Sequence, residues 1–521
     1  MKLDHLPVEL ILQIVPFLKK HDYAQLVLVC KSWYSLFIPH LYHHVVLPLN
    51  HYCGFGYGHK RYSKDLPVRR FTLALLENPT LAPLIHFLQL YPSDCEGKWQ
   101  NRPPLKPVAE EKYLPFMLPY GDAKRKHRRK FHAWRRDLRH RSERQDWYRK
   151  YRYEDAWLAL LMVQVKNLET FAIQLPEEWD HIVDEGEPLL KNSVRFERVI
   201  QWASNPKLGI LTYLKHISLR DGPDFWEYRT SVGAVPMNRL LPYLRIPSLR
   251  KLYVHNVCDR SRFHMPKSLV LPLTHLDLMA NDDDLPNLPS LLERCPNLQS
   301  FTLEVGDGTA NHTHQYLNHS RLYQPLRRSQ LSLRYLNLIF LSDRTWQDAE
   351  IPSPIFFGSL TEFRNLQTIH MRWSSLLPFL GSGSYDPEKS LRELLPCSLQ
   401  YLFIHDCLIQ SSLALCRELE TLQIHYFEAV PLLKALYLEY AVREQAPGQG
   451  CMKCVSGHWS NYRMMETDPV IDRRLLDLQG KFRTLGVDFR IIEPGATAKP
   501  FPLDGAIRTK WPWETFDGVL M

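Results

Sequence analysis

The segment LTHLDLMAN, residues 273–281, has leucine at its first, fourth and sixth positions and asparagine at its ninth. The alternation of Leu276, Asp277 and Leu278 predicts a short strand with one face in a core. The same apolar-x-x-apolar-x-apolar pattern recurs along the chain. It begins at Leu168, Leu214, Leu249, Leu273, Leu298, Leu333, Leu366, Leu399, Leu419 and Phe482, with an early candidate at Ile85. Because a unit of this size cannot bury its apolar face alone, the recurrence predicts that successive units stack.

This recurring pattern is the signature of leucine-rich repeats, in which each unit contributes one short strand and the strands stack in parallel, about 4.8 Å apart. Successive units start 20 to 63 residues apart, whereas regular repeats are about 20–29 residues long, which indicates insertions or further units. We therefore expect an irregular solenoid with parallel strands on its concave face and helices, such as residues 285–297, on its convex face. Ordinary α/β crossover units are the alternative interpretation.

The N-terminal segment, residues 1–49, follows a helical pattern. Leu10, Ile14 and Leu18 recur four residues apart, which predicts one apolar helix face. Pro7 suits the first turn of that helix, and Pro16 is expected to kink or end it. Two further helices are expected over residues 23–29 and 31–40. Three short helices cannot bury so much apolar surface by themselves, which indicates a partner.

This segment resembles an F-box. The resemblance rests on Leu6-Pro7, Glu9-Leu10, Ile14, Leu18, Leu26, Val29-Cys30-Lys31, Trp33 and Leu41-Tyr42. F-box domains bind the adaptor subunit of cullin-based ubiquitin ligases (SCF complexes), so the resemblance implies an adaptor-binding surface. The residues that would contact the adaptor or hold the helices together are Leu6, Pro7, Leu10, Ile14, Leu18, Val29, Cys30, Lys31 and Trp33. A helical cap that shields the first repeat is the alternative.

Alternate side chains of a repeat strand point away from the core, toward the open face of the sheet. Aromatic, arginine and histidine side chains, which are enriched in protein interfaces, are frequent at these positions. We expect an unidentified protein target to bind there. The candidate target-binding residues are Tyr253, His255, His370, Arg372, Trp373, Tyr401, Phe403, His405 and His425. Ordinary solvated strand positions are the alternative interpretation.

Residues 124–152 account for the net positive charge of the chain. They hold 14 Lys or Arg against 3 Asp or Glu, whereas the formal net charge of the whole chain is +9. Such a stretch suits nuclear import, an acidic partner or nucleic acid, and binding of nucleic acid through it is the alternative function. A solvated basic segment explains the same composition, so we do not expect nucleic acid to be the principal partner.

Ten cysteines occur in 521 residues, scattered singly except for Cys451 and Cys454, which favours reduced thiols and a cytoplasmic or nuclear location. Cys451, Cys454 and His458 could supply three ligands of a structural zinc site, but such a site needs four, and no second Cys or His motif accompanies them. We therefore expect neither a metal nor another cofactor. No apolar run is long enough to predict a transmembrane helix. The motifs of phosphate-binding loops, serine hydrolases and zinc proteases are missing from the sequence, so we expect a non-catalytic protein.

The expected fold class is therefore α/β, a three-helix F-box followed by an irregular leucine-rich-repeat solenoid. Its expected segments are an F-box at 1–49, an irregular connector with an early repeat and the basic stretch at 50–153, the solenoid at 154–493 and a C-terminal tail at 494–521. The resemblance implies a substrate-recognition subunit of an SCF-type ubiquitin ligase, with the head on the adaptor and the repeat face on the target.

Overall fold

The computed structural model describes residues 7–49, 67–92, 147–174, 194–220, 235–259, 265–266, 268–280, 285–305, 320–340, 356–378, 387–407, 412–440 and 469–492. The chain divides into two compact units. The first comprises Met1–Pro176, Asp180–Ile217 and Pro242–Leu249, and the second comprises Glu177–Trp179, Ser218–Leu241 and Arg250–Met521. None of the described helices is long and apolar enough to cross a membrane.

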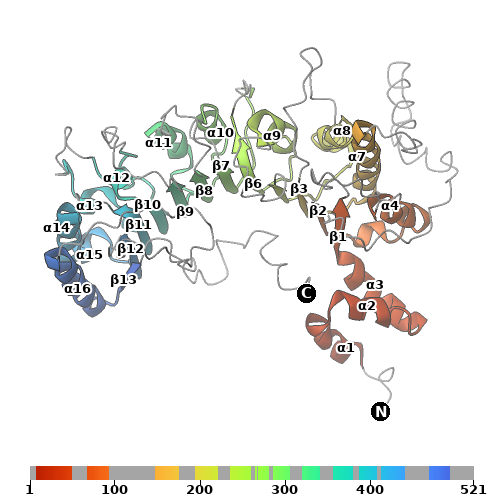
Figure 1. Ribbon diagram of the computed structural model, residues 1–521, viewed down its shortest axis with the longest axis horizontal. Helices are drawn as coiled ribbons and strands as arrows, with labels where there is room; N and C mark the ends of the chain where they lie inside the picture. The colour runs from red at the N-terminus through yellow and green to blue at the C-terminus, as the bar shows by residue number, and fades with distance from the viewer. Residues whose placement is uncertain are drawn as a thin grey trace, which may run out of the picture. The chain divides into compact units, whose positions relative to one another are not determined.

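The strands form one 13-stranded parallel sheet, in which chain order is sheet order except that β5 pairs beside β6 (Figure 1). The strands are β1 (His44–Leu49), β2 (Phe87–Pro92), β3 (Thr170–Gln174), β4 (His216–Arg220), β5 (Val235–Pro236), β6 (Lys251–Cys258), β7 (His275–Ala280), β8 (Ser300–Val305), β9 (Tyr335–Phe340), β10 (Thr368–Arg372), β11 (Tyr401–Cys407), β12 (Ala435–Tyr440) and β13 (Asp488–Ile492). Parallel neighbours in chain order confirm the repeat architecture that the leucine pattern predicts.

The first unit begins with a helical head of α1 (Val8–Ile14), the 3-10 turn η2 (Val15–Phe17), α2 (Lys20–Leu26) and α3 (Lys31–His43). Its other helical elements are α4 (Pro67–Glu77), η3 (Ala82–Leu84), α7 (Trp147–Gln164), α8 (Val194–Ala203) and η5 (Pro206–Leu208), while α9 (Met237–Leu244) and β4 are divided between the units. Helix α7 packs against both α4 and α8. Its stretch from residue 155 to residue 163 is buried all round, as expected of a helix with apolar residues on every face.

The second unit carries short helical segments between its strands. They are α10 (Leu288–Leu292), α11 (Ser320–Leu326), η6 (Arg327–Ser329), α12 (Trp373–Leu376), α13 (Leu391–Leu394), α14 (Ser412–Ile424), α15 (Tyr426–Ala429) and α16 (Pro469–Thr484). Helices α10 and α11 lie side by side, and α14 packs against both α13 and α16. The element order is therefore that of strand–helix repeats with unequal helical parts.

The core of the second unit is a column of equivalent apolar side chains. Strand register aligns Leu252, Leu276, Phe301, Leu336, Ile369, Leu402, Leu436 and Phe489 from β6 to β13. Each of these side chains is buried. Since full burial of one such side chain stabilises a fold by roughly 1.5–3 kcal/mol, this column is a principal source of cohesion between repeats.

A second ladder, of Ser and Asn side chains, links successive repeats at the residue before the first apolar position of the pattern. The hydroxyls of Ser248, Ser332 and Ser398 donate to the backbone oxygens of Leu214, Leu298 and Leu366 in the preceding repeats. The longer Asn side chains reach further, from Asn167 Nδ2 to Pro83 O and from Asn365 Nδ2 to Leu331 O. These bonds satisfy turn carbonyls that strand pairing leaves without an amide partner. The sequence interpretation did not identify this role of the Ser and Asn residues before each strand.

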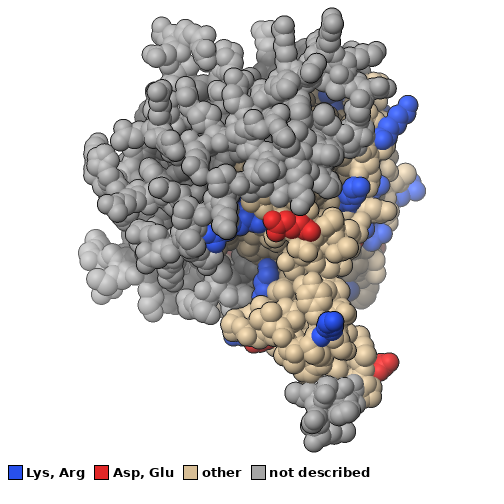
Figure 2. Space-filling model, turned by 90° about the vertical axis from the view of Figure 1, so that its right-hand side faces the viewer, with Lys and Arg blue, Asp and Glu red and all other residues tan. Residues whose placement is uncertain are grey.

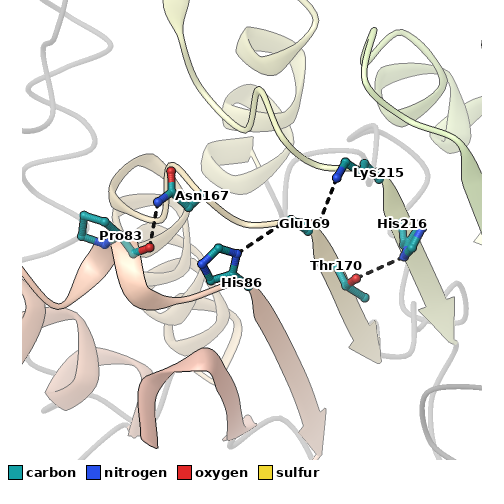
Figure 3. A network of polar contacts seen from close by, with 7 residues as sticks. All are labelled: Pro83, His86, Asn167, Glu169, Thr170, Lys215 and His216. Atoms are coloured by element: carbon teal, nitrogen blue, oxygen red, sulfur yellow. Dashed lines mark hydrogen bonds and ion pairs between the residues drawn. The ribbon is translucent and has the colours of Figure 1, made fainter. Parts of the chain in front are cut away.

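The first unit also carries a polar row where β2, β3 and β4 begin (Figure 3). Glu169 lies between His86 and Lys215, with His86 Nδ1 3.3 Å from its Oε1 and Lys215 Nζ 3.0 Å from its Oε2. One position further along the strands, Thr170 Oγ1 lies 3.3 Å from His216 Nδ1. The row connects the starts of three successive strands through side chains as well as backbone.

Two of the predicted repeat strands are wrong. The pattern at Leu419 lies inside helix α14, where Leu415, Leu419 and Leu422 are buried at helical spacing. The pattern at Phe482 covers the end of α16, and the strand starts later, at Asp488. The strand expected near Leu419 is instead β12, which overlaps a copy of the pattern that begins at Leu433 and that the sequence interpretation overlooked.

The head also differs in detail from the expectation. Helix α1 ends at Ile14 and a 3-10 turn contains Pro16, as the position of that proline predicts. Helix α2 begins earlier than expected, at Lys20, and α3 extends to His43. Residues 44–49, which were assigned to the head, form β1, the first strand of the sheet.

Candidate protein-interaction surfaces

The helices of the head are held to one another by a small aromatic core. Phe37 is buried, and its ring packs edge-on against Trp33 at 5.8 Å and tilted against Tyr23 at 6.2 Å between centroids. The hydroxyl of Tyr23 donates to Val15 O, which ties α2 to the turn that ends α1. Asp22 accepts from the backbone N–H of Lys19 and caps α2. These contacts leave the opposite surfaces of α1 and of the α2–α3 turn uncovered.

That uncovered surface is strongly apolar. Phe17 and Leu28 have 83% and 79% of their surface exposed. The other large exposed apolar residues of the head are Val8, Leu10, Leu12, Ile14, Val29 and Tyr34. The head, at the lower end of Figure 2, accordingly presents mostly uncharged surface with few Lys, Arg, Asp or Glu. We call these eight residues the head patch. An apolar cluster of this kind marks a surface for another protein.

The predicted adaptor residues divide between this patch and the interior of the head. Leu10, Ile14 and Val29 belong to the patch, and Pro7, Cys30 and Lys31 are also exposed. Leu18 and Trp33 are half-buried, and Trp33 packs on Phe37. Leu6 lies outside the described residues. The sequence interpretation missed Val8, Leu12, Phe17, Leu28 and Tyr34. The position of Phe17 directly after Pro16 was a usable signal, because a helix that ends there leaves the next side chain uncovered.

A second surface lies on the open face of the sheet at its C-terminal strands. Register places His370, Phe403, Tyr437 and Arg490 in one row across β10 to β13. His370 lies 4.0 Å from the ring of Phe403, and Phe403 packs edge-on against Tyr437 at 6.4 Å between centroids. The guanidinium of Arg490 lies 5.6 Å from the ring of Tyr437. We call these four residues the aromatic row.

Polar contacts and burial complete this surface. Tyr437 donates from its hydroxyl to Asp488 at 3.3 Å, and Arg490 pairs with the same carboxylate at 2.8 Å. Burial, with the Asp488 carboxylate acting in the same direction, raises the pKa of Tyr437, so its hydroxyl stays protonated as a donor. In the next row, Arg372 aligns with His405, and both are largely buried, at 8% and 4% exposed. The accessible members of this surface are therefore His370, Tyr401 and Arg490 rather than its buried centre.

The predicted target-binding residues do not all lie on this face. His370, Arg372, Tyr401, Phe403 and His405 come together on β10 and β11, and Tyr253 and His255 lie on β6. Trp373 is only 1% exposed at the start of α12, so it presents no surface to a partner. His425 lies between α14 and α15, where its Nδ1 is 3.3 Å from Glu428. The placement of Trp373 and His425 on the binding face is therefore wrong, because both belong to the helical parts of their repeats.

The sequence interpretation also missed Tyr437 and Arg490, since it overlooked the strand β12 and started the last strand too early. Among the described residues, no group of three His, Cys, Asp or Glu side chains is arranged to hold a metal ion. Cys451, Cys454 and His458 lie outside the described residues. So does the basic stretch up to residue 146, while residues 147–152 fall in α7.

Comparison with known protein families gives two matches. Residues 3–48 match the F-box-like family, and residues 138–412, more than half of the chain, match the leucine-rich repeat domain family. A search among curated proteins returned no match. The first match spans the head and most of β1, and the second ends just after β11.

Proposed function

Because the chain belongs to the leucine-rich repeat family and begins with an F-box-like domain, we propose that it is the substrate-recognition subunit of an SCF-type ubiquitin ligase. This pairing of domains is typical of non-catalytic receptor proteins. The observation that carries the proposal is the head patch, eight exposed apolar side chains on a domain whose own core is already filled by Phe37 and its aromatic neighbours.

In this function the head binds the ligase adaptor through the head patch. Phe17 and Leu28 are its most exposed members, so they lose the largest apolar area to a partner. Burial of apolar surface stabilises a complex by about 25 cal/mol per Å² before the costs of association. Leu18 and Trp33 act indirectly, by holding the helices that display the patch.

The sheet face of the second unit binds the target. The protein then acts by proximity, raising the effective concentration of target lysines near the ubiquitin-charged carrier without contributing a reacting group. The aromatic row and the adjoining Tyr401 favour a partner segment that offers an apolar or aromatic side chain to His370 and Tyr401 and a carbonyl or carboxylate oxygen to Arg490.

The adaptor interaction is tested with purified adaptor and the full chain. We expect Phe17→Ala to weaken binding at least tenfold, since it removes the most exposed ring of the head patch. Phe427→Ala is the matched control, because Phe427 is also an exposed phenylalanine, 76% exposed on α15. Tight binding that both variants retain, or no binding by the wild-type chain, would contradict the proposal.

Target binding is tested in cells by comparing proteins ubiquitinated in the presence of the wild-type chain and of Tyr401→Ala/Arg490→Ala. We expect the double variant to keep adaptor binding and to lose ubiquitination of a subset of proteins. An unchanged ubiquitination profile would place the target elsewhere on the chain.

A further inference from the structure

The junction between the head and the sheet is built from histidines. Helix α3 ends at His43 and strand β1 begins at His44, so no linker separates the head from the first repeat strand. His40 lies one helical turn before His43, and His86 directly precedes β2. Four imidazoles thus gather where the head joins the repeats, and neither proposed binding surface includes them.

Four contacts link these residues to their neighbours at the junction. The rings of His43 and His86 stack with centroids 5.0 Å apart, and the ring of His44 lies 4.0 Å from that of Phe87. From the head, Lys20 Nζ donates to His44 O at 2.8 Å. The backbone N–H of His86 donates to His43 O at 3.1 Å, which makes this amide a direct reporter of the junction.

The charges nearest to His43 and His44 act in both directions, with Lys20 opposing a proton on His44 and Glu169 favouring one on His43. Helix α2 contributes Lys20 beside His44 and carries Asp22 at its start, and α4, which packs on β1, carries Arg69 and Arg70. On the far side of His86 stands Glu169. That carboxylate already pairs with Lys215 (Figure 3), and the hydrogen bond from Lys215 lowers its pKa. The Glu169 carboxylate is therefore ionised. Because it also pairs with Lys215, it offsets only part of a positive charge on His86 or His43.

We propose that this histidine junction is a pH-dependent attachment of the head to the first strands, which protonation weakens. With neutral imidazoles, the stacked pair His43–His86 and the hydrogen bond from Lys20 to the backbone oxygen of His44 keep the head attached. A proton on His43 or His44 places a positive charge next to a stacked imidazole or next to Lys20, and the head is released.

The direction of the effect follows from proton linkage. Burial, with Lys20 and His43 adding to it, lowers the pKa of His44 from its ordinary value of 6.5 to about 4 while the head is attached. Partial desolvation and the neighbouring His86 also lower the pKa of His43, although His43 is an exposed residue and Glu169 acts in the opposite direction. A histidine whose pKa is lowered by docking takes up a proton when released, so release becomes more favourable as pH falls from about 6.5 toward 4. For His44 alone, the opening equilibrium rises about tenfold between pH 7.5 and pH 5.5.

Hydrogen exchange of the full chain tests the proposal without any partner. We expect the protection factors of the amides of His86 and of β1, corrected for the intrinsic pH dependence of exchange, to fall about tenfold or more between pH 7.5 and pH 5.5. The double variant His43→Phe/His44→Phe keeps rings in both places and removes the titration. Its protection is expected to be the same at the two pH values. His425→Gln, a substitution between α14 and α15 in the second unit, should behave as wild type.

Equal protection of the wild-type amides at both pH values would overturn the proposal, as would a fall that His425→Gln abolishes equally. If the double variant fails to fold, titration of labelled His44 in the wild-type chain decides the matter. A titration midpoint of His44 near 4 supports the proposed attachment, whereas one near 6.5 contradicts it. These measurements are independent of adaptor binding, so the proposed function and this inference can fail separately.

Discussion

At the scale of single residues, Gly358 shows how one missing side chain permits a close approach. Its φ is +134°, in a region that other residues rarely adopt. A Cβ built at this position would lie 2.5 Å from the ring of Tyr323. That ring is fixed by its hydroxyl bond to Ser359 O at 2.8 Å and by edge-on packing on Phe357 at 5.6 Å. The glycine is therefore required by both backbone and packing.

We expect Gly358→Ala to lower the free energy of unfolding by roughly 1–3 kcal/mol, because the new methyl group clashes with a fixed ring. Gly480→Ala is the opposite case. Gly480 lies within α16 with nothing within 4 Å of a built Cβ, so alanine is expected to stabilise by about 0.5–1 kcal/mol. Urea denaturation of both variants checks the pair, and equal effects would contradict the packing account.

The six cysteines in the described part of the chain differ in burial. Burial raises the pKa of Cys295 to about 12 and that of Cys416 to about 11, so both remain thiols and shielded. Cys30 and Cys397 are exposed. At pH 8 we expect iodoacetamide to modify Cys30 and Cys397 in the folded chain and to reach Cys295 and Cys416 only after unfolding, as read by mass spectrometry of peptides. Rapid native-state modification of Cys295 would contradict the assigned burial.

At the scale of elements, the Ser/Asn ladder is what ties one repeat turn to the next. Removing the hydroxyl of Ser332 or Ser398 leaves a carbonyl of the preceding repeat without its partner. We expect Ser332→Ala and Ser398→Ala each to cost about 1 kcal/mol of stability. Ser204→Ala is the control, since Ser204 bonds only within its own turn at an exposed site, and it should change stability by less than about 0.5 kcal/mol. Chemical denaturation distinguishes these outcomes.

Helices α14 and α16 are joined by a bidentate ion pair. Arg474 donates to Glu420 through Nε at 3.1 Å and through Nη2 at 2.8 Å, with both side chains about one-third exposed (32% and 34%). After allowance for solvent screening, we expect Arg474→Ala to cost about 1–2 kcal/mol. Arg474→Lys should recover only part of this, because an ammonium cannot form the forked contact. Lys481→Ala removes an exposed pair with Asp477 and is expected to leave thermal unfolding unchanged. Full rescue by lysine would argue against a geometric role.

At the scale of the whole molecule, the contacts of each repeat run mainly to its sequence neighbours. The strand order follows the chain order through both units, and such stacks transmit a local defect only to adjacent repeats. We therefore expect Gly358→Ala to increase amide exchange in β9 and β10 while leaving β1 to β3 unchanged. A uniform increase across all strands would show instead that the sheet opens as one cooperative unit.

Local pattern was sufficient for most of the architecture. The spacing of apolar residues predicted β2, β3, β4 and the strands from β6 to β11, because a parallel repeat strand needs its inward side chains at fixed positions. The position of Pro16 likewise predicted where the first helix ends. The same reasoning failed at Leu419, where i, i+3 spacing satisfies a helix face as well as a repeat strand.

What the sequence by itself determined is the class of the protein, an F-box-like head followed by parallel strand–helix repeats. Only the tertiary structure decided which side chains share a surface. His370, Phe403, Tyr437 and Arg490 are 33, 34 and 53 residues apart in sequence and become one row through strand register. Likewise, the stacking of His43 on His86 exists because β1 pairs with β2. Register between strands depends on how the intervening segments pack, and that information is not local.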